Sequence, residues 1–341
     1  MRHELLDWYD RSKRDLPWRR TDDPYAIWVS EIMLQQTRVA VVIERFKVFL
    51  ERFPTAEALA AADEQEVLAL WSGLGYYRRA RMLHKAAKTI VAEYAAKMPT
   101  AAAELRKLPG IGPYTAAAIA SIAHGEHAAV VDGNVERVLS RIRGWESYDS
   151  VGEAAVLRKV EEFSAGLVDP HRPGDFNQAI MELGATVCTP RNPQCLVCPW
   201  AKECRTLGEH KTPKRAPMTS REIACALIVR KGDAGTEVLL EQRAATNTVM
   251  PGMWELLLLP DGALAESDVR FTVRHAIMQV NYVVRVCEFR EEDLALLKSN
   301  GSERRWVSLG KAAEMALTGL ARKVLGKLRP RSTISIQQRS S

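Results

Sequence analysis

Glu31 is an acidic residue in a stretch of sequence that offers it little water. It falls within residues 24–37, PYAIWVSEIMLQQT, which are apolar on nearly every side and predict a helix with little solvent-facing surface. Burying an isolated charge is expensive, so this carboxyl group must pair with a cation, take up a proton or act in a reaction. The pairing alternative would place Glu31 at a frayed helix edge beside Arg19 or Arg38.

A second carboxylate, Asp132, lies in a region whose glycines suggest contact with an anion. Residues 108–115, LPGIGPYT, sit between two predicted helices, and the amides around Gly110 and Gly112 are free to hold a phosphate oxygen near a helix N-terminus. A plain interhelical turn would have the same sequence. Asp132 follows an apolar run and stands at the mouth of a helix that we expect to begin near Asn134.

Four of the six cysteines are clustered within 17 residues, in the spacing Cys-x6-Cys-x2-Cys-x5-Cys. They are Cys188, Cys195, Cys198 and Cys204. Such clustering in a chain without a secretory signal points to metal rather than to disulfides. Four thiolates suit either tetrahedral zinc or a cubane iron–sulfur cluster, and the ligand chemistry alone does not separate the two.

The composition is that of an ordinary globular protein with room for two domains. The chain has 341 residues, a formal charge of +6 and a pI near 9.0, which permit a polyanionic partner. No apolar run approaches the length of a membrane span, so we expect neither a transmembrane segment nor a signal peptide.

The hydrophobic periodicity changes along the chain from helical to alternating. Helical patterns continue to the cysteine cluster and include a helix expected between Asp175 as N-cap and Gly184 as its end. Residues 205–221 are rich in Lys, Arg, Gly and Pro and read as a basic linker. Beyond it, strand-like segments alternate with turns, and a helix near residues 310–328 closes the second domain.

Together, LPGIGPYT and the later VDGNV resemble the helix-hairpin-helix and Gly/Pro–Asp loop of the endonuclease III superfamily of DNA glycosylases. The segment SEIMLQQT resembles the catalytic-glutamate helix of the MutY-type adenine glycosylases in that superfamily. This resemblance implies a mainly α-helical glycosylase domain, residues 1–187, with the helix-hairpin-helix at about residues 105–119. It also implies that residues 188–204 hold one [4Fe–4S] cluster rather than zinc.

The activity implied by the resemblance is hydrolysis of the N-glycosidic bond of adenine mispaired with 8-oxoguanine or guanine in double-stranded DNA. Glu31 would protonate adenine at N7, and Asp132 would stabilise or covalently trap the sugar cation. Tyr114 and Asn134 would position both groups. In the family, Gln36 and the GLGYY segment enter the duplex as a wedge. The implied DNA-binding residues are Arg19, Gln36, Thr37, Leu74, Tyr76, Gly110, Gly112 and Lys202.

Residues 222–328 resemble the α+β Nudix-like C-terminal domain of MutY proteins, followed by a basic tail at residues 329–341. The Glu-rich box with which true Nudix hydrolases hold magnesium is missing, so this domain should bind rather than catalyse. In relatives, a turn between two strands offers an aromatic–Ser–His trio to 8-oxoguanine. The matching residues here are Ile277, Met278 and Gln279, which would either weaken that preference or be ordinary strand residues facing the core.

Tyr114 bears on the reaction type. Relatives that also cleave the strand carry a lysine there, and a tyrosine cannot form the Schiff base that β-elimination requires. We therefore expect a monofunctional enzyme. We also expect it to be a monomer in the cytoplasm, associated with the nucleoid if the source is bacterial, and away from membranes. The alternatives are a bifunctional endonuclease III-type glycosylase with AP lyase activity and a non-catalytic iron–sulfur DNA-binding protein.

Overall fold

The computed structural model describes residues 1–145, 153–210, 217–233, 235–260, 269–277, 279–297 and 303–328. Met278, the basic tail at residues 329–341 and residues 211–216 of the predicted linker lie outside these ranges. The chain divides into two compact units, Met1–Ala62 with Arg79–Lys214, and Asp63–Arg78 with Arg215–Ser341. Within the described ranges, no helix has the length and apolarity to cross a membrane.

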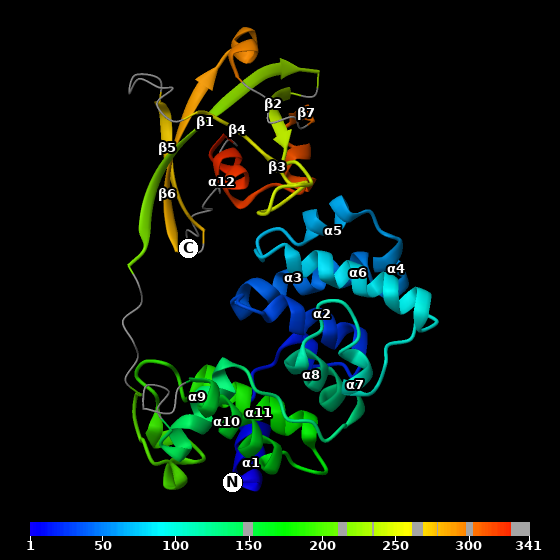
Figure 1. Cartoon of the computed structure of the whole chain (residues 1–341), viewed down its shortest axis with the longest axis vertical. Helices are drawn as coiled ribbons and strands as arrows, with labels where there is room; N and C mark the ends of the chain where they lie inside the picture. Colours follow the sequence, from blue (N-terminus) through cyan, green and yellow to red (C-terminus); the bar gives the residue numbers. More distant parts are fainter. Residues whose placement is uncertain are drawn as a thin grey trace, which may run out of the picture. The chain divides into compact units, whose positions relative to one another are not determined.

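The regular secondary structure in the described residues of the first unit is all helical (Figure 1). Its α-helices are α1 (Arg2–Ser12), α2 (Pro24–Leu34), α3 (Val39–Arg52), α4 (Ala56–Ala61), α6 (Arg78–Glu93), α7 (Ala102–Leu105), α8 (Pro113–His124), α9 (Gly133–Arg143), α10 (Glu153–Leu167) and α11 (Pro173–Thr186). Short 3-10 helices lie at Pro17–Arg19, Cys195–Val197 and Ala201–Glu203. Helices α1, α9, α10 and α11 share one apolar core, whereas α2 packs on α3 and α8. Helix α11 also packs on α8 and so joins the two groups.

The helix starts near the predicted site follow from local sequence and confirm the predictions. Pro113 occupies the first turn of α8, where its missing N–H costs nothing. Asp132 is the N-cap of α9, which begins one residue before the predicted Asn134. Helix α2 is buried from Tyr25 to Met33, as the apolar sequence predicts.

The predicted bounds of α11 are wrong, and the reason lies in packing. The helix begins at Pro173, before Asp175, and continues through Gly184 to Thr186. A glycine often ends a helix, but Gly184 is buried inside this one. A Cβ atom there would lie 2.6 Å from Cβ of Asn134, so the missing side chain makes room for the start of α9.

The second unit is built on a mixed seven-stranded sheet (Figure 1). Its strands are β1 (Thr219–Gly232), β2 (Gly235–Gln242), β3 (Trp254–Glu255), β4 (Leu257–Leu258), β5 (Val269–Ile277), β6 (Val280–Phe289) and β7 (Arg304–Ser308). The main order is β3-β2-β1-β6-β5, with β4 paired to β1 and β7 to β2. Only β1 and β6 pair in parallel among the described strands. Helix α12 (Gly319–Leu328) packs its apolar face on the sheet, which confirms a helical region followed by a mixed sheet.

A segment from the middle of the helical sequence groups with the second unit. Residues 63–78, which include α5 (Glu64–Leu70), belong to it by their contacts. The amide of Gln65 donates to the carbonyl of Gly252 at 3.2 Å, and the hydroxyl of buried Tyr77 donates to the carbonyl of Leu317 at 3.3 Å. Nothing in the sequence pattern of this segment predicted that assignment.

We expect Gly184→Ala to destabilise the protein by about 1–3 kcal/mol, because the new methyl group would force α9 away from α11. Gly166→Ala is the matched control: a Cβ there meets no atom within 4 Å, and an alanine in α10 should be neutral or slightly stabilising. Urea unfolding curves of the two variants and the parent measure the difference. Equal unfolding free energies for Gly184→Ala and the parent would contradict the close packing.

Candidate active site

A cavity of about 740 Å³ opens in the first unit between α2, α8, α9 and α11. Its wall includes residues that the sequence singles out for catalysis and for DNA contact: Glu31, Tyr114, Asp132, Asn134, Arg19, Gln36, Thr37, Gly110 and Gly112. Long stretches of chain separate these residues, and the packing of α11 against α8 and α9 brings them together. The cavity is therefore the candidate active site.

Glu31 lies in the wall of this cavity and is 6% exposed. Its Oε2 atom accepts a hydrogen bond of 2.9 Å from the hydroxyl of Tyr114. Burial raises the pKa of Glu31 to about 7, helped by the negative charge of Asp132 and opposed by the Tyr114 hydrogen bond and the charge of Arg19. Glu31 therefore does not lie at an exposed helix edge, and its hydrogen-bond donor is the neutral hydroxyl of Tyr114. A carboxyl group with such a pKa can hold a proton at neutral pH and give it up.

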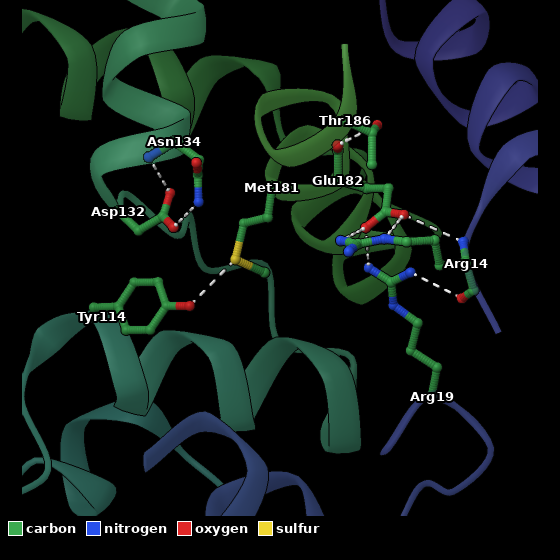
Figure 2. A network of polar contacts seen from close by, with 8 residues as sticks. All are labelled: Arg14, Arg19, Tyr114, Asp132, Asn134, Met181, Glu182 and Thr186. Atoms are coloured by element: carbon green, nitrogen blue, oxygen red, sulfur yellow. Dashed lines mark hydrogen bonds and ion pairs between the residues drawn. The ribbon is translucent and has the colours of Figure 1, made fainter. Parts of the chain in front are cut away.

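Asp132 combines a structural role with a position on the cavity wall. Its Oδ1 atom accepts hydrogen bonds from the backbone N–H groups of Asn134 and Val135, at 2.9 and 2.8 Å. Its Oδ2 atom accepts from the side-chain amide of Asn134 at 2.8 Å (Figure 2). These three donors fix the carboxylate at the N-terminus of α9, where the helix dipole also favours a negative charge.

Tyr114 reaches the cavity from α8 and faces two neighbours. Its hydroxyl oxygen lies 3.2 Å from the sulfur of Met181 on α11 (Figure 2). The same hydroxyl donates to Glu31. Burial, together with the charges of Glu31 and Asp132, raises the pKa of Tyr114 well above its usual value. The hydroxyl therefore keeps its proton and acts as a donor to Glu31.

Sequence reasoning missed a second buried carboxylate in the same wall. Glu182 on α11 is 1% exposed and accepts hydrogen bonds from Arg14 at 2.7 Å on each oxygen and from Arg19 at 2.9 Å (Figure 2). Burial alone would raise its pKa, but the two guanidinium groups outweigh that effect and lower the pKa of Glu182 to about 2. Arg19, predicted to contact DNA, is thus committed to an ion pair inside the protein. The one signal in the sequence was an acidic residue within an otherwise apolar helix face.

The four clustered cysteines line one small cavity beside α9 and α11. Arg141 approaches the sulfur of Cys188 at 3.4 Å, and the backbone N–H of Leu207 approaches the sulfur of Cys204 at 3.4 Å. Both donors suit sulfur atoms that carry negative charge. In the described part of the chain, no group of three or more His, Cys, Asp or Glu residues is arranged to hold a single metal ion. Four thiols around one shared cavity fit a cluster held by four cysteines.

One arginine connects the cysteine loop with the N-terminus of α9. The guanidinium group of Arg137 donates to the carbonyl of Cys188 at 2.9 Å, to Oδ1 of Asn134 at 2.9 Å and to the carbonyl of Gly184 at 2.7 Å. The orientation of Asn134, and through it that of Asp132, thus depends on the backbone of the cysteine loop.

The remaining predicted residues are not among those that line this cavity. Leu74 and Tyr76 belong to the second unit; Leu74 is buried, whereas Tyr76 is 54% exposed with a left-handed backbone, φ +47°. Lys202 is exposed on the cysteine loop. Ile277 ends β5, and Gln279 is exposed in the turn before β6, so the trio does occupy a turn between two strands; Met278 is outside the described residues.

Comparisons with known proteins agree with this architecture. Residues 29–162 match the family model described as HhH-GPD superfamily base excision DNA repair protein, and residues 188–204 match the iron–sulfur binding domain of endonuclease III. Among solved structures, a thermostable thymine-DNA glycosylase is similar, with a TM-score of 0.55 and 30% identity, covering 60% of this chain and 94% of that one. The chain therefore belongs to the HhH-GPD superfamily of base excision DNA repair proteins, with an endonuclease III-type [4Fe–4S] domain formed by the four cysteines.

Curated relatives narrow this class. The adenine DNA glycosylase of Mycolicibacterium smegmatis is 45% identical over 204 residues, 59% of this chain and 68% of that protein. The adenine DNA glycosylase of Homo sapiens is 40% identical over 310 residues, 74% of this chain and 56% of that protein. The chain belongs to the MutY-type adenine DNA glycosylase family. It spans little more than half of the human relative's length.

The burial of Glu31 predicts a stability difference that depends on pH. The pKa of Glu31 is about 7 when folded and near 4.5 when unfolded, so the folded state binds the proton more tightly and loses that advantage as pH rises from 4.5 through 7. Glu31→Gln keeps an acceptor for Tyr114 without a charge. Between pH 4 and pH 8, we expect the unfolding free energy of the variant to rise by up to about 3 kcal/mol relative to that of the parent.

Urea unfolding at both pH values measures this gain. Glu51→Gln, an exposed glutamate of α3, is the control and should show no pH-dependent gain. Parallel stability curves for Glu31→Gln and the parent would show that Glu31 is ionised without penalty.

Proposed function

We propose that this protein removes adenine from adenine:8-oxoguanine and adenine:guanine mispairs in double-stranded DNA, acting as a monomer. The observation that carries the proposal is the pairing, in one cavity, of a buried glutamate with a pKa near 7 and a fixed aspartate at a helix N-terminus. Hydrolysis of an N-glycosidic bond has two electrostatic tasks, protonating the leaving base and stabilising a cationic sugar, and two carboxyl groups can divide them.

The adenine must leave the base stack before either group can reach it, at a cost of roughly a few kcal/mol for unpairing and unstacking. The cavity, at about 740 Å³, has room for the extruded nucleoside. Glu31, protonated at neutral pH, would donate its proton to N7 of the base and so make adenine a better leaving group. The carboxylate of Asp132 would face the developing positive charge on the sugar, and Asn134 would keep it in place.

The reaction would stop at the abasic site. Strand cleavage by β-elimination needs an amine that forms a Schiff base with the sugar. Tyr114 stands where strand-cleaving relatives carry that lysine, and no lysine is among the described residues of the cavity wall. This favours the hypothesis of a monofunctional glycosylase over that of a bifunctional glycosylase and lyase. The presence of both carboxyl groups in the cavity argues against a non-catalytic protein.

The cluster would support the site through structure. A bound [4Fe–4S] cluster would tie together four points of the loop at residues 188–204. Arg137 then transmits the position of that loop, through Cys188, to Asn134 at the site. Exposed Lys202 on the same loop would contact a DNA phosphate.

Single-turnover base release on duplexes with A opposite 8-oxoguanine, G or T tests the proposal. The parent should release adenine from the first two and spare the third. Glu31→Gln and Asp132→Asn should each still bind the mismatched duplex but lose excision by about 10²–10⁴-fold, the usual range for acid–base catalysis. Parent-like excision by Glu31→Gln would refute its role as the acid.

Gln279 is the proposed side-chain reader of 8-oxoguanine. It is exposed in the β5–β6 turn, and its backbone carbonyl is already taken by the N–H of Thr219 at 3.0 Å, so the side-chain amide is what it can offer to a base edge. We expect Gln279→Ala to narrow the rate difference between A:8-oxoguanine and A:G by roughly 1–3 kcal/mol. Asn281→Ala, an exposed amide inside β6, is the control. An unchanged ratio in Gln279→Ala would move recognition elsewhere.

A further inference from the structure

One guanidinium group holds the C-terminal end of α2, the helix that carries Glu31. The Nη1 atom of Arg79, on α6, donates to the carbonyl oxygens of Ile32 at 2.7 Å, Met33 at 3.0 Å and Gln35 at 2.6 Å. Its Nη2 atom donates to the hydroxyl of Thr37 at 3.0 Å. Four acceptors from the end of one helix and its following loop thus converge on a single side chain.

The contacts of Arg79 stabilise two features of the segment at the end of α2: its last carbonyl groups and the backbone conformation of Gln36. The last carbonyl groups of a helix lack partners within the helix, and a positive charge at that end is favoured by the helix dipole. In addition, Gln36 has φ +55°, a left-handed conformation that a residue with a Cβ adopts only when its surroundings hold it. Arg79 binds the residue on each side of Gln36, the carbonyl of Gln35 and the hydroxyl of Thr37.

The segment that Arg79 holds is part of the cavity wall. Gln35, Gln36 and Thr37 line the cavity together with Glu31, which precedes Gln35 by about one helical turn. The amide of Gln35 also lies within 3.4 Å of the hydroxyl of Thr115 on α8, the helix of Tyr114. A change in the conformation at the end of α2 would therefore shift Gln36, which we expect to enter the duplex, relative to Glu31, which we expect to protonate the base.

We propose that Arg79 is a positioning residue for base extrusion: its guanidinium fork fixes Gln36 in the left-handed conformation and at a set distance from Glu31. This inference rests on the proposed function, because it assigns Arg79 a part in presenting the base to the acid. A phosphate contact is the competing role for an arginine in this region, and it requires only the positive charge. We call this set of four contacts the Arg79 clamp. It requires the guanidinium fork, because a lysine ammonium group has its three donors at one point and cannot bind the three carbonyl oxygens and also the Thr37 hydroxyl, which the second nitrogen of Arg79 reaches.

The test compares Arg79→Lys and Arg79→Met with Lys88→Met, the loss of an exposed cation farther along α6. Single-turnover adenine release from an A:8-oxoguanine duplex gives the rate constant of folded, bound enzyme, which a smaller active fraction does not change. A duplex with 2-aminopurine opposite 8-oxoguanine reports base extrusion by fluorescence. We expect both Arg79 variants to lose about 10- to 100-fold in release rate and in the extrusion equilibrium, while Lys88→Met matches the parent.

The pH dependence of release separates positioning from damage to the acid. Its midpoint near pH 7 should stay unchanged in Arg79→Lys, because Glu31 and Tyr114 keep their contact. A parent-like rate and extrusion signal in Arg79→Lys, with loss only in Arg79→Met, would overturn the clamp and assign Arg79 to a phosphate. If the parent extrudes 2-aminopurine but releases no adenine, the proposed function fails, and the extrusion signal of the variants still decides the clamp. No extrusion by the parent would overturn both.

Discussion

The free-energy cost of burying the carboxyl group of Glu31 is the constraint on which the arrangement of the cavity depends. Helix α2 is buried from Tyr25 to Met33, so the Glu31 side chain on it is shielded from water. The surrounding helices then supply a neutral donor, the hydroxyl of Tyr114, and a second negative charge, Asp132, rather than a cation in direct contact. Since neither neighbour neutralises a carboxylate, the proton stays on Glu31 into the neutral range. An apolar helix sequence thereby yields a carboxyl group that can hold a proton at neutral pH.

Glu182 shows what the same burial produces when the partners differ. Both glutamates are almost inaccessible to solvent and line the same cavity. Two guanidinium groups lower the pKa of Glu182 to about 2, whereas burial beside a hydroxyl raises that of Glu31 to about 7. One carboxylate is thus a permanent charge that fixes Arg14 and Arg19 and ties the segment before α2 to α11. The opposite pKa shifts of these two buried carboxyl groups follow from their different neighbours, two guanidinium groups at Glu182 against a hydroxyl and a second carboxylate at Glu31.

Local sequence signals predicted the parts of the site that depend on neighbouring residues. The apolar surroundings of Glu31, the N-cap position of Asp132 and the cysteine spacing are all properties of short segments, and the structure or the comparisons confirm them. The ion pairs of Glu182 and the clamp by Arg79 join residues far apart in the chain, so no local pattern contains them. The end of α11 was mispredicted for a similar reason: Gly184 reads locally as a helix stop, but its conformation is set by the approach of Asn134.

The assignment of residues 63–78 to the second unit changes how the two units are tethered. The chain passes from one unit to the other at residues 62–63, 78–79 and 214–215, so three covalent connections join them and the basic linker is only one. The two short connections join residues 63–78 to the first unit, and the linker is the covalent connection of residues 215–341 to the rest of the chain. Doubling its length would cost only about 0.6 kcal/mol in chain entropy if it acted as a flexible loop. A proteolytic cut within it would separate residues 215–341 covalently from the rest of the chain, and only noncovalent contacts such as those of Gln65 and Tyr77 would then hold them to residues 63–78.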